Sequence, residues 1–565
     1  MNKPLLISLA AATILTSSVN AGSMYDRIQT MELQMKQMEK ELTTLKSAKT
    51  EKTETSVVEE EDTEDEEEES SDIESEDSDD EESANDEDDE GEDSDEDEDE
   101  ETVEERLDDL EESVTDLNKN TNGSHLKFSV DYRFAVDNLQ YKMADGSKQS
   151  NDALMTNRLW INMNWKATEN LSFTGQLGYN KAFGARGSVT PQNSAFETFD
   201  WITNENAYDG IVRVRSAYFL YKDDNFLGED VWTFSIGRRP STNGHLINLR
   251  DDDVAASPMG HTINVEFDGL SAKFAFSELT GIDGMYVKLC AGRGGTNAVP
   301  KFSAAPYATD TSAGNNPDID LAGLIFVPYN DGQYGIATQY YYANNLIDVV
   351  PVFNTIPTFT PGNPNPTGSL TTAAAAFDTV GGLHSFTANF TMNGIGDEWS
   401  DYLDDTFFFV SGAVSVTDPK ADRGMIGSKP GESKTGYSAW IGLQMPSVMT
   451  EEGRWGVEYN KGSAYWRSIT YAEDTNVGSK LAARGDAYEL YFTEPIIEDI
   501  LSLQIRYTYI DYKYTGSNGF FGNGSGASKL IDTLSSTSTN PQDPYSQANT
   551  IDIAQDLRVY LRYRY

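Results

Sequence analysis

The chain has 565 residues, a formal net charge of −52 and a single cysteine, Cys290. One cysteine excludes an intrachain disulfide, and the absence of a basic patch argues against nucleic-acid binding. About three-quarters of residues 59–101 are Asp or Glu, so much of the acidity belongs to one block and not to the whole protein.

Residues 1–21 have the pattern of a cleaved signal peptide. Lys3 supplies the positive start, an apolar run extends from Leu5 to Leu15, and Ala21 ends a small-residue cleavage site. The apolar run is too short to span a bilayer. We therefore expect the chain to be exported, and no cysteine follows the cleavage site to carry a lipid anchor.

Residues 22–50 are predicted to form a coiled-coil helix. Apolar residues recur at steps of four and three, the pattern of a seam that pairs with another helix. The simplest partner is a second copy of the chain, and both a dimer and a trimer remain open. An amphipathic helix that lies on a membrane or docks in a barrel mouth is the alternative. The seam residues are Met24, Ile28, Met31, Met35, Met38, Leu42 and Leu45.

The acidic stretch, residues 51–101, is predicted to be a disordered linker. Few apolar residues and like charges throughout cannot offset the entropy cost of ordering. The stretch could bind divalent cations diffusely, or it could serve only as a solvated spacer. A second set of heptad positions over residues 102–120, from Val103 to Leu117, predicts a short coiled-coil neck before the next domain.

Residues 124–565 are predicted to form an all-β transmembrane antiparallel β-barrel of about 16–18 strands. The last nine residues show the pattern most clearly, because Leu557, Val559 and Leu561 alternate with arginines. The other face of many segments carries Arg, Asn, Gln and Ser, which suits a wet lumen better than a packed sandwich core. Alternating segments are expected near 127–136, 159–165, 171–179, 211–221, 231–239, 262–276, 319–343, 382–391, 405–416, 436–445, 453–471, 484–493, 501–514 and 557–565.

The connections between these segments alternate in length. Short ones, such as 167–170 and 446–452, suit the periplasmic rim, whereas long polar ones, such as 344–381 and 515–548, suit the cell exterior. An aromatic final residue also resembles the signal that the barrel assembly machinery reads.

No catalytic motif is present in the sequence: no zinc-protease, nucleophile-elbow or phosphate-loop pattern stands in a suitable context. His245 and His261 fall in one loop region, but two scattered histidines are more often surface polar residues than metal ligands. We therefore expect no enzyme activity, no metal site and no resident cofactor.

Pore function needs charged lumen residues and a constriction. The alternation places six arginines on the lumen face, and the loop after Gly237 could fold inward to form an eyelet. The alternative is that such arginines pair with acids or lipid headgroups near a rim. The pore-lining candidates are Arg133, Arg213, Arg215, Arg558, Arg562 and Arg564, and the constriction candidates are Arg238, Arg239, Arg250, Asp251, Asp252 and Asp253.

Three stretches resemble an uncharacterised family of porin-like outer-membrane proteins, a domain of unknown function. They are residues 157–164 continuing to 173–175, residues 235–244 (SIGRRPSTNG) and residues 458–466 (EYNKGSAYW). The resemblance covers most of the chain after Gly123 and implies a barrel, but it brings no catalytic residues. The order of signal peptide, coiled coil and barrel is also similar to that of porins whose N-terminal coiled coil projects into the periplasm.

The sequence therefore predicts an outer-membrane, porin-like channel for passive passage of small hydrophilic solutes or ions. Its expected location is the outer membrane of a Gram-negative-type bacterium, with the N-terminal region in the periplasm. Expected partners are outer-membrane lipid, the barrel assembly machinery and further copies of the chain. Two other functions stay open: a structural or surface protein, either an envelope tether or an adhesin, and a barrel that sheathes a redox partner.

Overall fold

A computed structural model describes the chain from residue 126 onward. The predicted signal peptide, coiled coil, acidic linker and neck all lie outside the described residues. Within 126–565, the positions not described are 185–211, 229, 299–300, 302–303, 310–316, 351–375, 397–398, 471–472, 518–526, 538–542 and 544.

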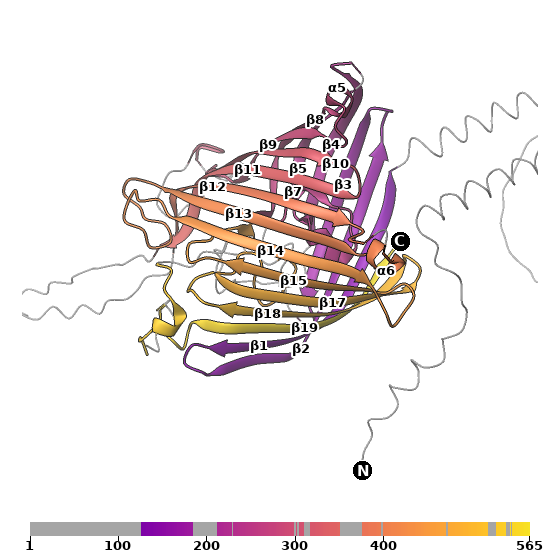
Figure 1. Ribbon diagram of the computed structural model, residues 1–565. Helices are drawn as coiled ribbons and strands as arrows, with labels where there is room; N and C mark the ends of the chain where they lie inside the picture. Colours follow the sequence, from indigo (N-terminus) through magenta and orange to yellow (C-terminus); the bar gives the residue numbers. More distant parts are fainter. Residues whose placement is uncertain are drawn as a thin grey trace, which may run out of the picture. The chain divides into compact units, whose positions relative to one another are not determined.

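The described residues form one closed antiparallel β-barrel (Figure 1). Its sheet has 17 strands, and all but β16 stand in the wall. Each wall strand pairs with the next one along the chain, and β19 closes the barrel against β1, where Val130 and Tyr565 exchange backbone hydrogen bonds of 2.6 and 2.9 Å. The sixteen-stranded wall confirms the predicted fold class. The wall strands are β1 (Lys127–Met143), β2 (Lys148–Lys166), β3 (Leu171–Ala182), β4 (Arg213–Phe226), β5 (Asp230–Ser241), β8 (Ile263–Ala275), β9 (Tyr286–Gly295), β10 (Ile319–Asn330), β11 (Tyr334–Val350), β12 (Ala376–Asn393), β13 (Phe407–Pro419), β14 (Thr435–Pro446), β15 (Arg454–Gly462), β17 (Gly485–Ile497), β18 (Leu501–Tyr512) and β19 (Ile551–Arg564).

Short elements occupy the connections between wall strands. They are β6 (Gly244–His245), the 3-10 helix η1 (Ile247–Asp251), β7 (Ala256–Met259), α5 (Ser277–Thr280), α6 (Asp401–Asp404), β16 (Ile469–Thr470) and η3 (Ile531–Thr533). No helix in the described part of the chain has the length and apolar character needed to cross a membrane.

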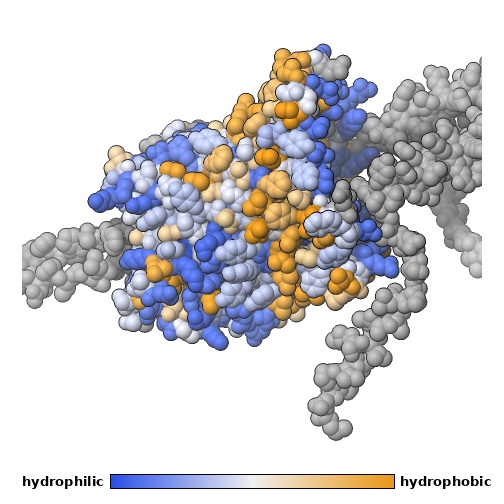
Figure 2. All heavy atoms as spheres, viewed as in Figure 1, coloured by the Kyte–Doolittle hydropathy of each residue, from blue (hydrophilic) through white to orange (hydrophobic). Residues whose placement is uncertain are grey.

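Side chains alternate between the two faces of the wall, as a strand's period of two requires. On β19, Leu557 is 46% exposed whereas the neighbouring Arg558 is 1% exposed. Figure 2 shows hydrophobic side chains gathered in a band across the strands, with more hydrophilic surface on either side. Exposed members of the outer face include Phe386, Val410, Ile441, Val457, Leu490, Ile505 and Val559. An apolar belt outside a closed barrel is the surface that lipid covers.

One strand prediction is wrong. The alternating stretch 453–471 was expected to be a single wall segment, but the wall strand β15 ends at Gly462. The chain then leaves the wall, and only Ile469 and Thr470 are extended again, as β16, in a parallel pairing with Ile263 and Asn264 of β8. This departure matters for the lumen.

Candidate functional site inside the barrel

Residues 242–262, between β5 and β8, fold into the barrel, and we call them the first inward segment. Arg250 contacts Glu489 of β17 with 3.1 Å between Nη1 and Oε1, and both side chains are buried. The hydroxyl of Tyr560 on β19 donates to Asp251 at 2.9 Å. Because β17 and β19 lie far around the wall from β5 and β8, the segment crosses the lumen.

Backbone carbonyls of this segment are held by amide side chains of the wall. Gln504 donates to the carbonyl of Arg250 at 2.6 Å, and Gln444 donates to the carbonyl of Leu249 at 2.8 Å. These bonds satisfy groups that would otherwise be buried without a partner. Apolar packing adds to the attachment through a buried cluster of Leu246, Ile247, Phe409, Trp440 and Leu481.

His261 fixes the far end of the first inward segment. Its two ring nitrogens lie 2.8 Å from the hydroxyls of Ser411 on β13 and Ser438 on β14. His261 belongs to the segment and not to a wall strand, and burial lowers its pKa to about 3. The imidazole is therefore neutral at ordinary pH, and its two hydrogen bonds attach the segment to β13 and β14.

Residues 463–470 and 473–484, between β15 and β17, belong to a second inward segment that the sequence pattern does not indicate. Its centre is Asp474, whose carboxylate accepts from Arg133 at 2.7 Å and lies 3.5 Å from a guanidinium nitrogen of Arg558. Arg158 and Arg506 each place a nitrogen 3.9 Å away. Burial would raise the pKa of Asp474, but the charges of Arg133 and Arg558 outweigh it and hold that pKa well below its usual value.

The two inward segments meet at one carboxylate of the wall. Glu489 accepts from Arg250 of the first segment and, at 2.5 Å, from Lys480 of the second. Lys480 also lies 2.6 Å from Glu458. All of these side chains are at most 3% exposed, and shared buried ion pairs of this kind depend on every partner being present.

The structure places most predicted pore arginines in ion pairs with acidic side chains. Arg562 pairs with Asp131 at 2.5 Å and with Asp253 at 2.8 Å, so a wall residue and a segment residue share it. The remaining contacts are Arg133 with Asp474, Arg558 with Asp137 and Asp474, Arg215 with Glu266 and Thr242, and Arg564 with Asp253 and the carbonyl of Asp252, while Arg213 begins β4.

The constriction candidates fall into two groups. Arg250 and Asp251–Asp253 all lie in the first inward segment, at its 3-10 helix and just after it. Arg238 and Arg239 instead belong to the wall strand β5. There, Arg238 lies 3.4 Å from Glu266, and Arg239 covers the ring of Tyr218 at 4.3 Å.

A polar cavity of about 440 Å³, which we call the vestibule, lies between the first inward segment and the wall strands β1–β4 and β19. Its lining mixes amide and hydroxyl side chains with paired charges. Val254, between η1 and β7 in the segment, lines it and is 95% exposed. The polar lining residues include Ser129, Asp131, Asn162, Asn164, Thr174, Gln176, Arg215, Ser216, Tyr218, Thr242, Asn243, Asp253, Arg562 and Arg564.

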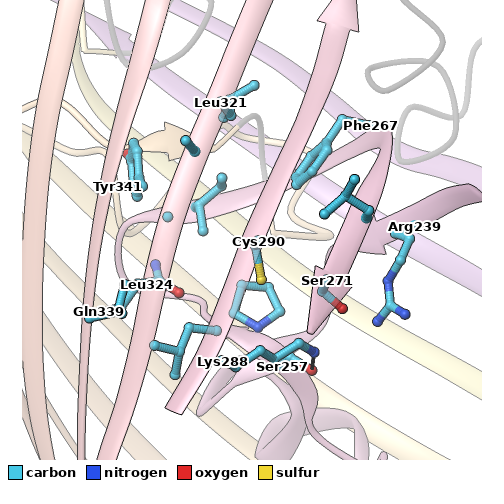
Figure 3. A pocket seen from close by; sticks show the side chains of 16 residues that line it. Arg239, Ser257, Phe267, Ser271, Lys288, Cys290, Leu321, Leu324, Gln339 and Tyr341 are labelled. Carbon is cyan, nitrogen blue, oxygen red and sulfur yellow. Dashed lines mark hydrogen bonds between the residues drawn. The ribbon is translucent and has the colours of Figure 1, made fainter. Parts of the chain in front are cut away.

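A second cavity, of about 60 Å³, lies beside β8–β11 and is mostly apolar (Figure 3). Cys290 lies near its centre, and Lys288 reaches Ser257 of the first inward segment at 2.5 Å. Its volume suits a few water molecules and not a solute. Among the described residues, no group of three or more His, Cys, Asp or Glu side chains is placed to hold a metal ion.

Together these features define a transmembrane antiparallel β-barrel whose lumen contains two segments of its own chain. The family described as "Protein of unknown function (DUF3373)" matches residues 148–565. The chain belongs to this family, which confirms the resemblance seen in the sequence. None of the curated proteins matches the chain.

Solved structures of outer-membrane proteins are similar to this chain at low identity. In-vitro folded OmpT of Vibrio cholerae has 12% identity and a TM-score of 0.39, covering 78% of this chain and 97% of that one. OmpF of Salmonella typhi in complex with daunomycin has 11% identity and a TM-score of 0.39, covering 79% and 99%. OprB of Pseudomonas putida at high pH has 11% identity and a TM-score of 0.40, covering 80% and 97%.

Proposed function

We propose that this protein is an outer-membrane channel for passive passage of small hydrophilic solutes or ions, with a lumen narrowed by its two inward segments. The supporting observation is the vestibule, a polar cavity of about 440 Å³ inside a barrel whose outer face is apolar. A wet, polar-lined space in a lipid-covered cylinder is what permeation requires.

The two inward segments give this channel its expected character. They cross the lumen and are held by buried ion pairs, such as Arg250 with Glu489 and Arg133 with Asp474. Rigid obstructions of this kind limit solute size. We therefore expect a small single-channel conductance, below that of a sixteen-stranded barrel with an unobstructed lumen.

Planar-bilayer recording of the refolded, full-length protein tests the proposal. Discrete, ohmic conductance steps in KCl are expected. A protein that runs as a folded, heat-modifiable barrel on gels but never gives a conductance step would contradict channel function.

A matched pair of valines sharpens the test. Val254 lines the vestibule and is 95% exposed, whereas Val448, in the β14–β15 turn, is 80% exposed. Val254→Trp adds bulk in the proposed path without displacing packed neighbours, so we expect it to lower the unit conductance. Val448→Trp adds the same bulk outside the lumen and is expected to leave conductance unchanged. Equal effects of the two variants would count against a path past Val254.

The environment of the barrel belongs to the same proposal. The outer apolar belt fits outer-membrane lipid, and we propose that the barrel assembly machinery inserts the protein there. We propose that the short connections face the periplasm together with the N-terminal region. We also propose that the N-terminal helices join copies of the chain into a homo-oligomer. The acidic linker can hold divalent cations diffusely. No resident cofactor and no catalysis are part of this function.

The lumen's contents disfavour the redox-sheath alternative. Such a sheath must leave room for another protein, but the first inward segment contacts both Glu489 and Tyr560 across the lumen. A tether or adhesin role concerns the N-terminal region and the outer loops, and it is compatible with a channel. Deleting residues 22–120 separates the two: loosened outer membrane with intact conductance would assign tethering to that region.

A further inference from the structure

One wall of the vestibule carries two cross-strand rows of uncharged polar side chains. In the first row Ser129, Asn162 and Gln176 are direct neighbours on β1, β2 and β3. Gln176 donates to Asn162 at 2.7 Å, and Asn162 donates to Ser129 at 3.1 Å. Their hydrogen bonds to one another fix the orientation of the amides. The row is therefore preorganised rather than free to rotate.

The second row is its neighbour on the same face. Asn164 on β2 pairs with Thr174 on β3, and Thr174 pairs with Tyr218 on β4. All three residues line the vestibule. Asn164 is exposed, and none of the hydrogen bonds within the described part of the chain uses the side chains of Asn164 or Thr174. This row therefore offers both donors and acceptors to whatever occupies the cavity.

The charged side chains that line the vestibule are each paired with an opposite charge. Arg215 lies 2.9 Å from Glu266. Arg562 is shared by Asp131 and Asp253, and Asp253 also lies 3.5 Å from Arg564. A charged solute would have to give up hydration without finding an unpaired counter-charge among these side chains, which is costly.

We propose that the vestibule is a binding site for uncharged, hydroxyl-rich solutes of about monosaccharide size. This deepens the proposed function by naming its substrate class and rests on it. A hydroxyl both donates and accepts, so a polyol can satisfy Asn164 and Thr174 at once while leaving the ion pairs intact. A cavity of about 440 Å³ falls within the size range of small-molecule sites.

The test compares three solutes that share one carbon skeleton but differ in charge. Tracer uptake of glucose, gluconate and glucosamine is measured in proteoliposomes containing the refolded full-length protein, with KCl on both sides. We expect glucose to enter about fivefold faster than either charged analogue, which corresponds to the effect of roughly one hydrogen bond. Gluconate or glucosamine entering as fast as glucose would overturn the proposal.

Variants of the second row locate the site. The double change Asn164→Leu and Thr174→Val removes the free polar groups, and Val has nearly the shape of Thr. We expect the preference for glucose over both charged analogues to be lost, while heat-modifiability on gels shows that the variant still folds. Asn151→Leu is the matched control, because Asn151 is an exposed asparagine of the same strand, β2, that does not line the vestibule. A preference that survives the double change, or falls equally in the control, would refute the assignment.

A readout independent of transport separates this inference from channel function. Saturation-transfer NMR on the detergent-solubilised protein detects glucose binding whether or not the barrel conducts, and the double variant is expected to lose the signal. Conductance without glucose binding would refute the proposed binding site but support the channel. Glucose binding without conductance would refute channel function but support the proposed binding site.

Discussion

Asp474→Asn should leave uncompensated positive charge among the arginines that surround this position inside the barrel. The carboxylate lies within 4 Å of guanidinium nitrogens from Arg133, Arg158, Arg506 and Arg558. Arg158 keeps Asp131 at 3.7 Å and Arg558 keeps Asp137. Asp474 is the only acidic side chain among the described residues that forms a salt bridge with Arg133 or Arg506.

Two magnitudes follow from this geometry. Removing one partner from a buried ion pair costs about 3–5 kcal/mol, and the lower end is expected because the Asp474 backbone carbonyl still accepts from Arg506 and Arg558. The uncompensated charge also acts on passing ions. At roughly 8 Å in water it is worth about 0.5 kcal/mol per unit charge. Because it favours chloride and disfavours potassium by that amount each, the permeability ratio should shift about fivefold towards chloride.

Two measurements check the effect. The reversal potential in a KCl gradient reports the selectivity shift, and the urea midpoint of the folded barrel reports the stability loss. Asp552→Asn is the control, since Asp552 pairs with Lys142 at 2.6 Å on the surface, where ion pairs contribute about 0–1 kcal/mol. If Asp474→Asn matched this control in both readouts, the account of a charge-compensated lumen would be wrong.

Further predictions concern two wall glycines and the buried His261. Gly237 has φ of +135°, and a Cβ there would collide with the backbone of β4, so Gly237→Ala should cost about 1–3 kcal/mol. Gly412→Ala, where nothing lies within 4 Å, should be neutral; heat-modifiability on gels compares their folded fractions. His261→Gln removes a titrating group that is neutral in the folded barrel with a pKa of about 3. Because the unfolded His261 takes up a proton below about pH 6.5 and the folded one does not, this residue makes wild-type stability fall as pH drops towards 3. Urea titrations should therefore show wild-type stability falling faster than that of the variant, by at most about 1.4 kcal/mol per pH unit; parallel slopes would contradict a neutral, buried imidazole.

The wall strands could be predicted from the sequence because the face on which each side chain lies depends only on its neighbours along the chain. A period of two over nine residues places Leu557 and Arg558 on opposite faces whatever the rest of the chain does. The same period of two puts Asn162 and Asn164 on one face of their segment, and Thr174 and Gln176 on one face of theirs. The alternation does not predict where the first inward segment lies. That segment encloses the vestibule beside these polar side chains.

The second inward segment could not be predicted because its contacts are not local. Asp474 and Arg133 are separated by 341 positions, and no spacing rule relates them. The stretch after Gly462 also begins with alternating residues, so it was interpreted as a longer strand. The mixed charges of Glu473, Asp474 and Lys480 were the available signal, since a lipid-facing strand would not carry them.

Pairing, and not composition, decides what the lumen presents to a solute. By composition alone, six arginines on the lumen face would favour anions. In the structure, Arg562 forms ion pairs with both Asp131 and Asp253. Its positive charge is therefore compensated within the protein. Charges compensated in this way no longer select ions by sign. The groups left to distinguish solutes are then the uncharged ones, Asn164 and Thr174, which is why we propose an uncharged, hydroxylated solute for the vestibule and not an ion.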